Sequence, residues 1–339
     1  MKMDENLLFR KAYGCLAGVA CGDAMGMPTS MMSPQSIHKV FPRGIDSFQL
    51  PPKGHPIHGG LVAGQVTDDT MQTLVVADAI LGDGEIIPRN LALRLLRWAE
   101  SLNGFESLLL GPSSLRALRA IKEGKDITRT GAFGDTNGAC MRISPVGIIH
   151  PGKIRETVND VALACLPTHN TDIAIAGASA VACAIAAGIN NAGTIDEVIQ
   201  AARAGADLGM QRGNPWFGAS IVRRLELALQ FASTAPSEED FLRYLYECIG
   251  AGVAVTETVP VCLALVKFAS GDPVRTITLA ANLGGDADTI ASIAGGIAGA
   301  YTGIDAFPPA YLHLIEKVNH LDLETYAYRL TQFVVNHRS

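Results

Sequence analysis

Apolar residues recur at helical spacing along most of this chain, and the strict alternation typical of a half-buried strand does not occur. In residues 6–22, for example, Leu8, Cys15 and Val19 fall on one side of a helix. The periodic segments predict helices at residues 6–22, 67–81, 88–101, 113–123, 153–166, 171–189, 194–207, 218–232, 238–249, 257–269, 272–282, 288–301 and 309–335, the last broken near His320. We therefore predict an all-α fold, as one compact multi-helix domain over residues 1–339.

Three irregular stretches separate these helices, at residues 28–66, 102–112 and 124–138. The first is long and rich in Pro, Gly and His, and loops of that length inside a compact domain are often functional. We expect the helix at residues 6–22 to end in the turn-rich segment 22–28, because Gly and Pro punctuate it. Pro145 is expected to interrupt the helix that follows residue 138.

Small and apolar residues dominate the composition: 48% of the 339 residues are hydrophobic, only 18% are charged and 6% are aromatic. Such a chain favours closely packed small-residue helices over a β-sandwich, since strands prefer β-branched and aromatic residues. The most apolar run, residues 174–189, is rich in Ala and shorter than the roughly 18 residues of a membrane span. It is predicted to be a core helix.

Charge and cysteine usage narrow the class of protein further. The formal net charge is −6 and no basic stripe occurs, which argues against nucleic acid as a partner. The seven cysteines are scattered without a CxxC pair, so we expect reduced core residues of a cytoplasmic protein, and neither a structural zinc site nor a signal peptide. No membrane association is expected, and an oligomer is compatible with the sequence.

The segment Gly284–Thr289 combines two glycines, two carboxylates and a hydroxyl, and it runs directly into a predicted helix. Gly and Asp favour turns and helix starts, so Asp286, Asp288 and Thr289 are placed at the start of a buried helix. The small residues Gly295 and Gly299 within that helix would allow another helix to approach closely.

A similar start lies far upstream, where Thr67, Asp68, Asp69 and Thr70 precede an apolar helix. Capping and the helix dipole explain either start taken alone. Two such starts, with four carboxylates in an otherwise apolar chain, indicate a role beyond capping, because buried carboxylates are costly unless they are paired or bound to metal. If the two starts converge, a hard divalent cation is the natural neutraliser.

Five motifs occur in one order along the chain: GDAMG (22–26), TDDT (67–70), NGACMRISP (137–145), THN (168–170) and GGDADTIA (284–291). In this pattern the chain resembles the ADP-ribosylglycohydrolase family, which includes the dinitrogenase-reductase-activating glycohydrolase. The resemblance implies an all-α fold with a central dinuclear Mg²⁺ or Mn²⁺ site. It also implies cleavage of an N- or O-glycosidic bond at the ribose anomeric carbon of an ADP-ribosylated substrate, either a small ribosyl molecule or a modified side chain.

The resemblance implies a set of metal ligands in the two acidic starts, with Asp288 bridging the two ions. The implied ligands are Thr67, Asp68, Asp69, Asp286, Asp288 and Thr289. All of them are oxygen donors, which suits Mg²⁺, Mn²⁺ or Ca²⁺ better than zinc or copper. In the implied catalysis, Asp68 or Asp69 would hold the attacking water and accept its proton.

Substrate contacts are implied mainly by the loop before residue 142. Asn137, Gly138 and Ala139 would present backbone amides to the phosphate and ribose end, and Arg142 would add charge. His169 matches a family position near the substrate, and Phe133 would stack on a base. Each of the last three side chains also has a purely structural reading: an ion pair for Arg142, a hydrogen-bonded histidine for His169 and a core position for Phe133.

Two departures from the family pattern affect the acid–base chemistry. Ser30 stands where several members carry a glutamate, and Leu109 stands where some carry an aspartate, which leaves Glu106 as the nearby acid. Water activated at the metals, or Glu106, would have to substitute. Two alternatives follow: a hydrolase of a small free nucleoside or other N-ribosyl metabolite, and a non-catalytic member that binds metal or ligand.

Overall fold

The computed structural model describes residues 4–106 and 110–337 of the chain. Across that part of the chain the regular secondary structure is helical, with only three isolated β-bridges, which confirms the all-α prediction. The helices are α1 (Glu5–Gly26), η1 (Met27–Thr29), α2 (Pro34–Val40), α3 (Asp68–Asp83), α4 (Pro88–Ser101), α5 (Pro112–Lys122), α6 (Ile127–Thr130), α7 (Gly138–Met141), α8 (Ser144–Ile149), α9 (Ile154–Cys165), α10 (Asp172–Ile189), α11 (Ile195–Gly209), α12 (Ile221–Thr234), α13 (Glu238–Tyr244), η2 (Leu245–Ile249), α14 (Val255–Phe268), α15 (Pro273–Leu283), α16 (Ala287–Thr302), η3 (Ile304–Ala306), α17 (Pro309–Asn319) and α18 (Leu323–Asn336).

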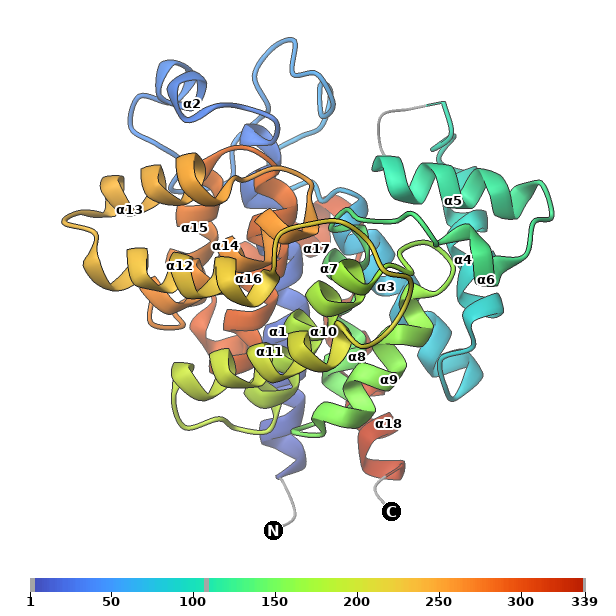
Figure 1. Cartoon of the computed structure of the whole chain (residues 1–339). Coiled ribbons are helices and arrows are strands. Elements are labelled where there is room, and N and C mark those ends of the chain that lie inside the picture. The colour runs from blue at the N-terminus through green and yellow to red at the C-terminus, as the bar shows by residue number, and fades with distance from the viewer. Residues whose placement is uncertain (1–3, 107–109, 338–339) are drawn as a thin grey trace.

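Helices α1 and α16 lie antiparallel and in close contact at the centre of the molecule (Figure 1). Their contact is a stripe of small residues spaced four apart, so that each helix presents one narrow face to the other. The stripe consists of Gly14, Gly18, Gly22 and Gly26 on α1 and of Ala287, Ala291, Gly295 and Gly299 on α16. A Cβ atom on Gly18 would lie 2.0 Å from the carbonyl oxygen of Gly295. Because the helices are antiparallel, the end of α1 meets the start of α16.

The predicted end of the first helix is wrong for this reason. The segment 22–28 was expected to form a turn, but α1 continues through Gly26. A Cβ atom on Gly22 would lie 2.1 Å from the carbonyl oxygen of Ala291. The glycines that suggested a turn therefore serve the close approach of α16, and the helix ends only where η1 begins.

Helix α10 forms the second part of the core and contacts α8, α9, α11 and α16. Within the described residues it is the one helix long and apolar enough to cross a membrane, yet 89% of it is buried inside the fold. Its position is that of the predicted core helix. All seven cysteines fall within the described residues and are free thiols, six of them buried and Cys248 exposed.

The remaining differences from the predicted elements are short. The irregular stretch 28–66 contains η1 and α2, and the stretch 124–138 contains α6. The single helix expected at 238–249 divides into α13 and a π-helical turn, η2. Pro145 lies in the first turn of α8, after the chain has left α7 at Met141.

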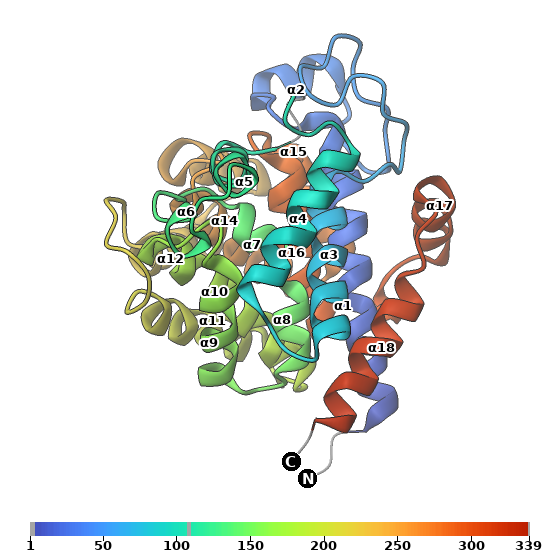
Figure 2. The ribbon, with the colours of Figure 1, turned by 90° about the vertical axis from the view of Figure 1, so that its right-hand side faces the viewer.

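The last two helices return the chain to its beginning. His320 adopts a left-handed conformation (φ 54°) and ends α17, at the predicted break. Helix α18 then packs on α1, and both views show the start of α1 near the end of α18 (Figures 1 and 2), where Gln332 donates to Glu5 at 2.6 Å. Helix α17 stands at the margin of the bundle (Figure 2).

Candidate metal and substrate site

The start of α3 combines ordinary capping with an anchor from α1. Thr67 is the N-cap, and its Oγ1 accepts the amide of Asp69 at 3.5 Å. Asp23, a fully buried residue of α1, accepts the amide of Thr67 (2.9 Å) and both the amide (3.1 Å) and hydroxyl (2.5 Å) of Thr70. Asp23 therefore fixes the first turn of α3 on the central helix pair, a role that sequence reasoning missed although the residue lies in the GDAMG motif.

The start of α16 depends on two glycines that both adopt positive φ, 80° at Gly284 and 70° at Gly285. Gly285 donates its amide to the carbonyl of Met32 (2.8 Å), and Asp286 donates its amide to the carbonyl of Ala251 (2.7 Å). A Cβ atom on Gly285 would lie 2.0 Å from the Ala251 oxygen. Only glycine fits this turn, which brings the loops around residues 31 and 251 to the helix start.

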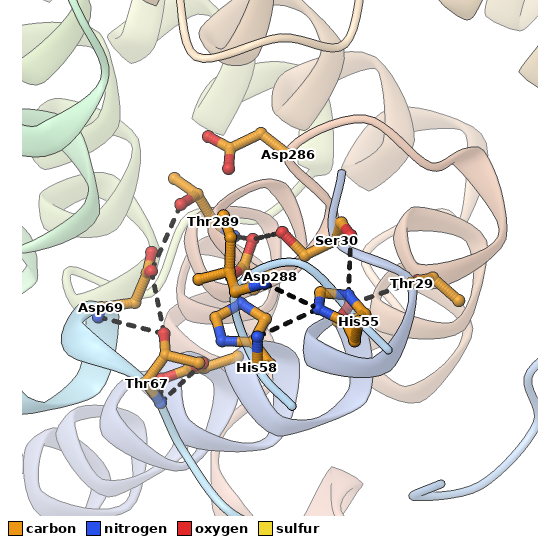
Figure 3. A network of polar contacts seen from close by, with 12 residues as sticks. Thr29, Ser30, His55, His58, Thr67, Asp69, Asp286, Asp288 and Thr289 are labelled. Atoms are coloured by element: carbon orange, nitrogen blue, oxygen red, sulfur yellow. Dashed lines mark hydrogen bonds and ion pairs between the residues drawn. The ribbon is translucent and has the colours of Figure 1, made fainter. Parts of the chain in front are cut away.

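Three residues from other parts of the chain hold the two carboxylates of this start, and Figure 3 shows two of them, Ser30 and His58, beside Asp288. Ser30 donates its hydroxyl to Asp288 Oδ1 at 2.7 Å, and His58 Nε2 lies 2.8 Å from Asp288 Oδ2. Asn137 donates its amide Nδ2 to Asp286 Oδ2 at 2.5 Å. Asp288 therefore has partners on both oxygens, while Asp286 is fixed through one.

The two acidic starts meet at one cavity. Thr289 donates its hydroxyl to Asp69 Oδ2 at 3.2 Å, which links α16 directly to α3 across 220 residues of sequence. The cavity measures about 210 Å³, many times the roughly 10–15 Å³ that one water requires. It is lined by Ser30, Met31, Ile57, His58, Asp68, Asp69, Leu110, Gly111, Pro112, Ser114, Thr136, Asn137, Gly138, Met141, Val253, Asp286, Asp288 and Thr289. No Lys or Arg occurs among these described lining residues.

The electrostatics of the cavity reflect crowded, buried carboxylates. Burial and the neighbouring aspartates raise the pKa of Asp68 and Asp69 well above their usual range, and raise that of Asp286 to about 7. Burial also acts to raise the pKa of Asp288, but the hydrogen bond and charge of His58 outweigh it, so that pKa lies below its usual range. Burial thus opposes the charged forms of Asp68, Asp69 and Asp286, and among the described lining residues His58 is the one basic side chain that could offset their charge.

The side chains present fit a hard divalent cation. Five of the six expected ligands line the cavity, and the sixth, Thr67, is tied to Asp69. Asp69 Oδ1 is buried and has no hydrogen-bond partner among the described residues, and a buried carboxylate oxygen without a partner is costly. In the described ranges no three acidic, histidine or cysteine side chains already stand together as a metal-binding group. The assignment therefore rests on donor chemistry and the shared cavity.

Two histidines of the long first loop were not singled out by sequence reasoning. His55 Nε2 lies 2.9 Å from the carbonyl of Ser30, while its Nδ1 accepts the amide of His58 at 3.0 Å. A single tautomer of His55, protonated on Nε2, satisfies both contacts. The two rings stack 5.2 Å apart, and this arrangement holds His58 against Asp288. The signal in the sequence was the unusual length of this loop together with its histidines.

The expected substrate loop reaches the cavity in part. Asn137 and Gly138 line it, whereas Ala139 is buried just behind them and is absent from the lining. The side chain of Asn137 is occupied by Asp286 and by a second contact, 2.9 Å to the hydroxyl of Thr258. Asn137 therefore contributes to the site through its side chain as well as through the backbone.

Arg142 and His169 lie in the interior and do not line the cavity. Arg142 donates to Gln72 (2.6 Å) and Thr168 (2.5 Å), and Gln72 in turn donates to Asp68 Oδ2 at 2.8 Å. The guanidinium thus supports Asp68 from behind, through Gln72. His169 is fully buried between hydroxyl partners, and burial together with the nearby Arg142 charge holds its pKa well below the usual range.

Phe133 and Glu106 lie outside the cavity. Phe133 is 57% exposed and packs against Trp216, with ring centroids 5.6 Å apart. Glu106 is exposed at the end of the second loop, and Leu109 lies outside the described residues. The side chains of Phe133 and Glu106 therefore do not line the cavity at the acidic helix starts.

Comparison with known proteins finds relatives of this chain over nearly its whole length. A family model described as ADP-ribosylglycohydrolase matches residues 4–338. The protein YegU of Escherichia coli K12, which has no assigned function, is 39% identical over 95% of this chain and 97% of its own length. The ADP-ribosylarginine hydrolase Tri1 of Pseudomonas putida is 25% identical over 92% of this chain and 76% of its own length.

A solved structure shows the same fold. It is titled ADP-ribosylglycohydrolase-related protein complex, and it superposes with a TM-score of 0.69, covering 97% of this chain and 99% of the other. The identity between the two is 22%, so this likeness concerns the fold alone.

Proposed function

Because the chain belongs to the ADP-ribosylglycohydrolase family and is a glycosyl hydrolase, we propose that it is metal-dependent and cleaves the bond at the ribose anomeric carbon of an ADP-ribosylated or ADP-ribose-like substrate. The observation that carries this proposal is the cavity where Asp68, Asp69, Asp286 and Asp288 converge without Lys or Arg. Buried carboxylates in such numbers require a counter-charge.

Two divalent cations, Mg²⁺ or Mn²⁺, are the proposed counter-charge. The residues that would hold them are Thr67, Asp68, Asp69, Asp286, Asp288 and Thr289, all of which present oxygen donors. Cations of this kind supply Lewis-acid chemistry and positive charge beside the sugar. Asp288 already has Ser30 and His58 on its two oxygens, so these residues orient the carboxylate proposed to be shared.

The chain's own residues account for the remaining requirements of hydrolysis. In this proposal Asp69, whose Oδ1 is buried and has no hydrogen-bond partner in the described structure, accepts the proton of the attacking water. The carboxylates around the cavity favour the positive charge that develops on the sugar as the glycosidic bond breaks. Asn137 and Gly138 form the wall against which the ribosyl group would rest.

The position of the missing loop glutamate is informative. Ser30 is buried and its hydroxyl is committed to Asp288, so this residue orients a carboxylate and is not itself an acid or base. Glu106 does not reach the cavity and therefore does not replace the glutamate in this structure. Proton transfer falls to groups at the helix starts.

A second candidate substrate class is a small free nucleoside or another N-ribosyl metabolite. The observation that favours it is the size and lining of the cavity: about 210 Å³, with Phe133, Arg142 and His169 all outside it. Phe133, expected to stack on a base, and Arg142, expected to add charge at the phosphate and ribose end, thus do not enclose this space. The cavity by itself suits a single ribosyl unit.

A substrate panel with and without metal tests both candidates. The protein, stripped of metal by chelation, is assayed with Mg²⁺, Mn²⁺ or no ion on an ADP-ribosyl-arginine peptide, an ADP-ribosyl-serine peptide and a set of free nucleosides. We expect hydrolysis only with an added ion, and a rise in melting temperature on metal addition that is independent of activity. Equal turnover and equal melting temperature without any ion would refute the metal proposal, and the substrates that are cleaved decide between the two classes.

A further inference from the structure

A second cavity adjoins the first, and nothing described so far uses it. It measures about 570 Å³ and is formed by the loop before α3, one face of α3, the end of α4 and the end of α17. Its lining residues are Ile57, His58, Gly59, Leu61, Gln65, Val66, Thr67, Asp68, Met71, Trp98, Leu102, Val318, Asn319 and His320. The end of α17, which stands at the margin of the bundle (Figure 2), contributes Val318, Asn319 and His320 to its wall.

The two cavities share part of their walls. Ile57, His58 and Asp68 line both of them. His58 lines both cavities and lies against Asp288, which lines the first (Figure 3). A molecule whose ribosyl group occupied the first cavity would reach the second only past Ile57, His58 and Asp68, which line both.

The chemistry of the second cavity differs sharply from that of the first. Half of its lining is aliphatic, thioether or aromatic: Ile57, Leu61, Val66, Met71, Trp98, Leu102 and Val318. Among the described lining residues there is no Lys or Arg, so the cavity has no permanently cationic side chain to favour a phosphate or carboxylate. The acid that lines it, Asp68, is one of the proposed metal ligands.

Two further features make this a formed site and not a loose gap. Trp98 contributes to the wall, while its Nε1 is buried away from the open space and has no hydrogen-bond partner in the described structure. Asn319 accepts the amide of Val66 (3.0 Å) and donates to the carbonyl of Gly64 (2.8 Å), which fixes the loop to α17. Binding sites for small molecules are typically apolar and aromatic with few polar groups for orientation.

We propose that the second cavity is the leaving-group subsite of the hydrolase, and that it takes an uncharged aromatic or heteroaromatic group. This inference rests on the proposed function. In the reaction, the oxygen of water forms a bond to the anomeric carbon while the bond from that carbon to the leaving group breaks. The leaving group keeps the electron pair of that bond and gains a proton, so that one water is consumed.

Trp98 provides a direct measurement of binding. The chain has two tryptophans, and Trp216 lines neither cavity, so Trp216→Phe leaves Trp98 as the single fluorescent indole. Nicotinamide and adenine are the probes, with ribose as a non-aromatic comparison. We expect saturable quenching of Trp98 by the two heteroaromatic probes and none by ribose.

Filling the cavity tests the location. In the Trp216→Phe background, Val318→Phe places a ring in the cavity and should weaken probe binding by about fivefold or more, since overpacking at this scale costs about 1 kcal/mol or more. Leu102→Phe, at a residue 49% exposed, is a second filling variant that folding tolerates. Val40→Phe, at a residue 44% exposed on α2 and outside both cavities, is the matched control and should leave binding unchanged.

A kinetic readout complements binding. The ratio of kcat/KM for 4-nitrophenyl riboside over methyl riboside should fall by about fivefold or more in Val318→Phe and in Leu102→Phe but not in Val40→Phe. An absence of quenching, or quenching that is equal in all variants, overturns the subsite. Quenching that the filling variants weaken, combined with no hydrolysis of any riboside, instead overturns the proposed function and leaves an aromatic-ligand site.

Discussion

The two acidic helix starts look alike in sequence but are held in different ways. The start of α3 caps itself with Thr67 and is anchored by one carboxylate, Asp23, from the helix beneath it. The start of α16 has no side-chain cap from Asp286, and its carboxylates are held by Ser30, His58 and Asn137.

The sequence separations show what this difference means. Asp23 lies 44 residues from Thr67, whereas the partners of the α16 start lie 258, 230 and 149 residues away. The α3 start is thus determined largely by its own turn and the preceding helix. The α16 start is assembled only when three residues from two distant loops arrive, and it is the more sensitive of the two to the rest of the fold.

The largest effect is expected at the α16 start. Asp288→Asn removes the carboxylate charge proposed to be shared between two ions and should lower kcat by about 10²–10⁴-fold, the range typical of a group that acts on the reacting atoms. Steady-state rates at saturating Mg²⁺ measure it. Asp305→Asn, at an exposed residue of η3, is the control and should retain full activity. A rate in Asp288→Asn within twofold of the native rate would contradict the proposed role of Asp288 as a metal ligand.

The close approach of α1 and α16 should give the largest effect on stability. Gly18→Ala places a methyl group 2.0 Å from the carbonyl oxygen of Gly295, where backbone on both sides must move, so we expect a loss of about 3 kcal/mol. Denaturant unfolding measures the free energy. Gly193→Ala is the control, because its Cβ would meet only Glu197 at 3.5 Å. Equal stability of the two variants would show that the helix pair can separate without cost.

The anchor of the α3 start should have a smaller effect, on metal affinity. Asp23→Asn puts an amide group against the donors of Thr67 and Thr70, so the first turn of α3 should shift and affinity for Mn²⁺ should fall by about 10–100-fold. Calorimetric titration with Mn²⁺ measures it, with Asp46→Asn at an exposed loop residue as the control. An equal loss of Mn²⁺ affinity in Asn137→Ala would show that the α3 and α16 starts depend equally on the side chains that hold them. An unchanged Mn²⁺ affinity in Asp23→Asn would contradict the anchoring role of Asp23.

The smallest effect concerns pH and His169, which lies behind the loop that carries Asn137. Its pKa in the folded protein is lowered by burial and by Arg142, so the folded state holds the neutral ring. Below the ordinary pKa of about 6.5 the unfolded chain binds the extra proton, and stability is lost at up to about 1.4 kcal/mol per pH unit as pH falls. Unfolding free energies between pH 7 and about pH 5.5 should fall less steeply in His169→Asn than in the native protein. An identical slope would contradict the buried neutral state, and His320→Asn, at an exposed position, serves as the control.

Most helices follow from local pattern, because a 3.6-residue apolar period and capping residues act within a few turns. The predicted segments 88–101 and 272–282 agree closely with α4 and α15 for this reason. The end of α1 was misplaced because the same glycines signal a turn when read locally and a close helix contact in the folded protein. Short helices inside the loops, such as α2 and α6, carry too few residues to show a period.

The sequence by itself determined the helices, the family motifs and two clusters of oxygen donors at helix starts, since each of these depends on residues near one another along the chain. Only the tertiary structure decided that the clusters share one cavity, that Ser30 and His58 hold Asp288, that Arg142 stands behind Asp68, and that Trp98 lines a second cavity. These contacts join residues that lie between 70 and 258 positions apart in the sequence, and no local preference of the backbone specifies them. They form because the glycine faces of α1 and α16 let the two central helices come together, and that packing brings one end of each helix to the same point.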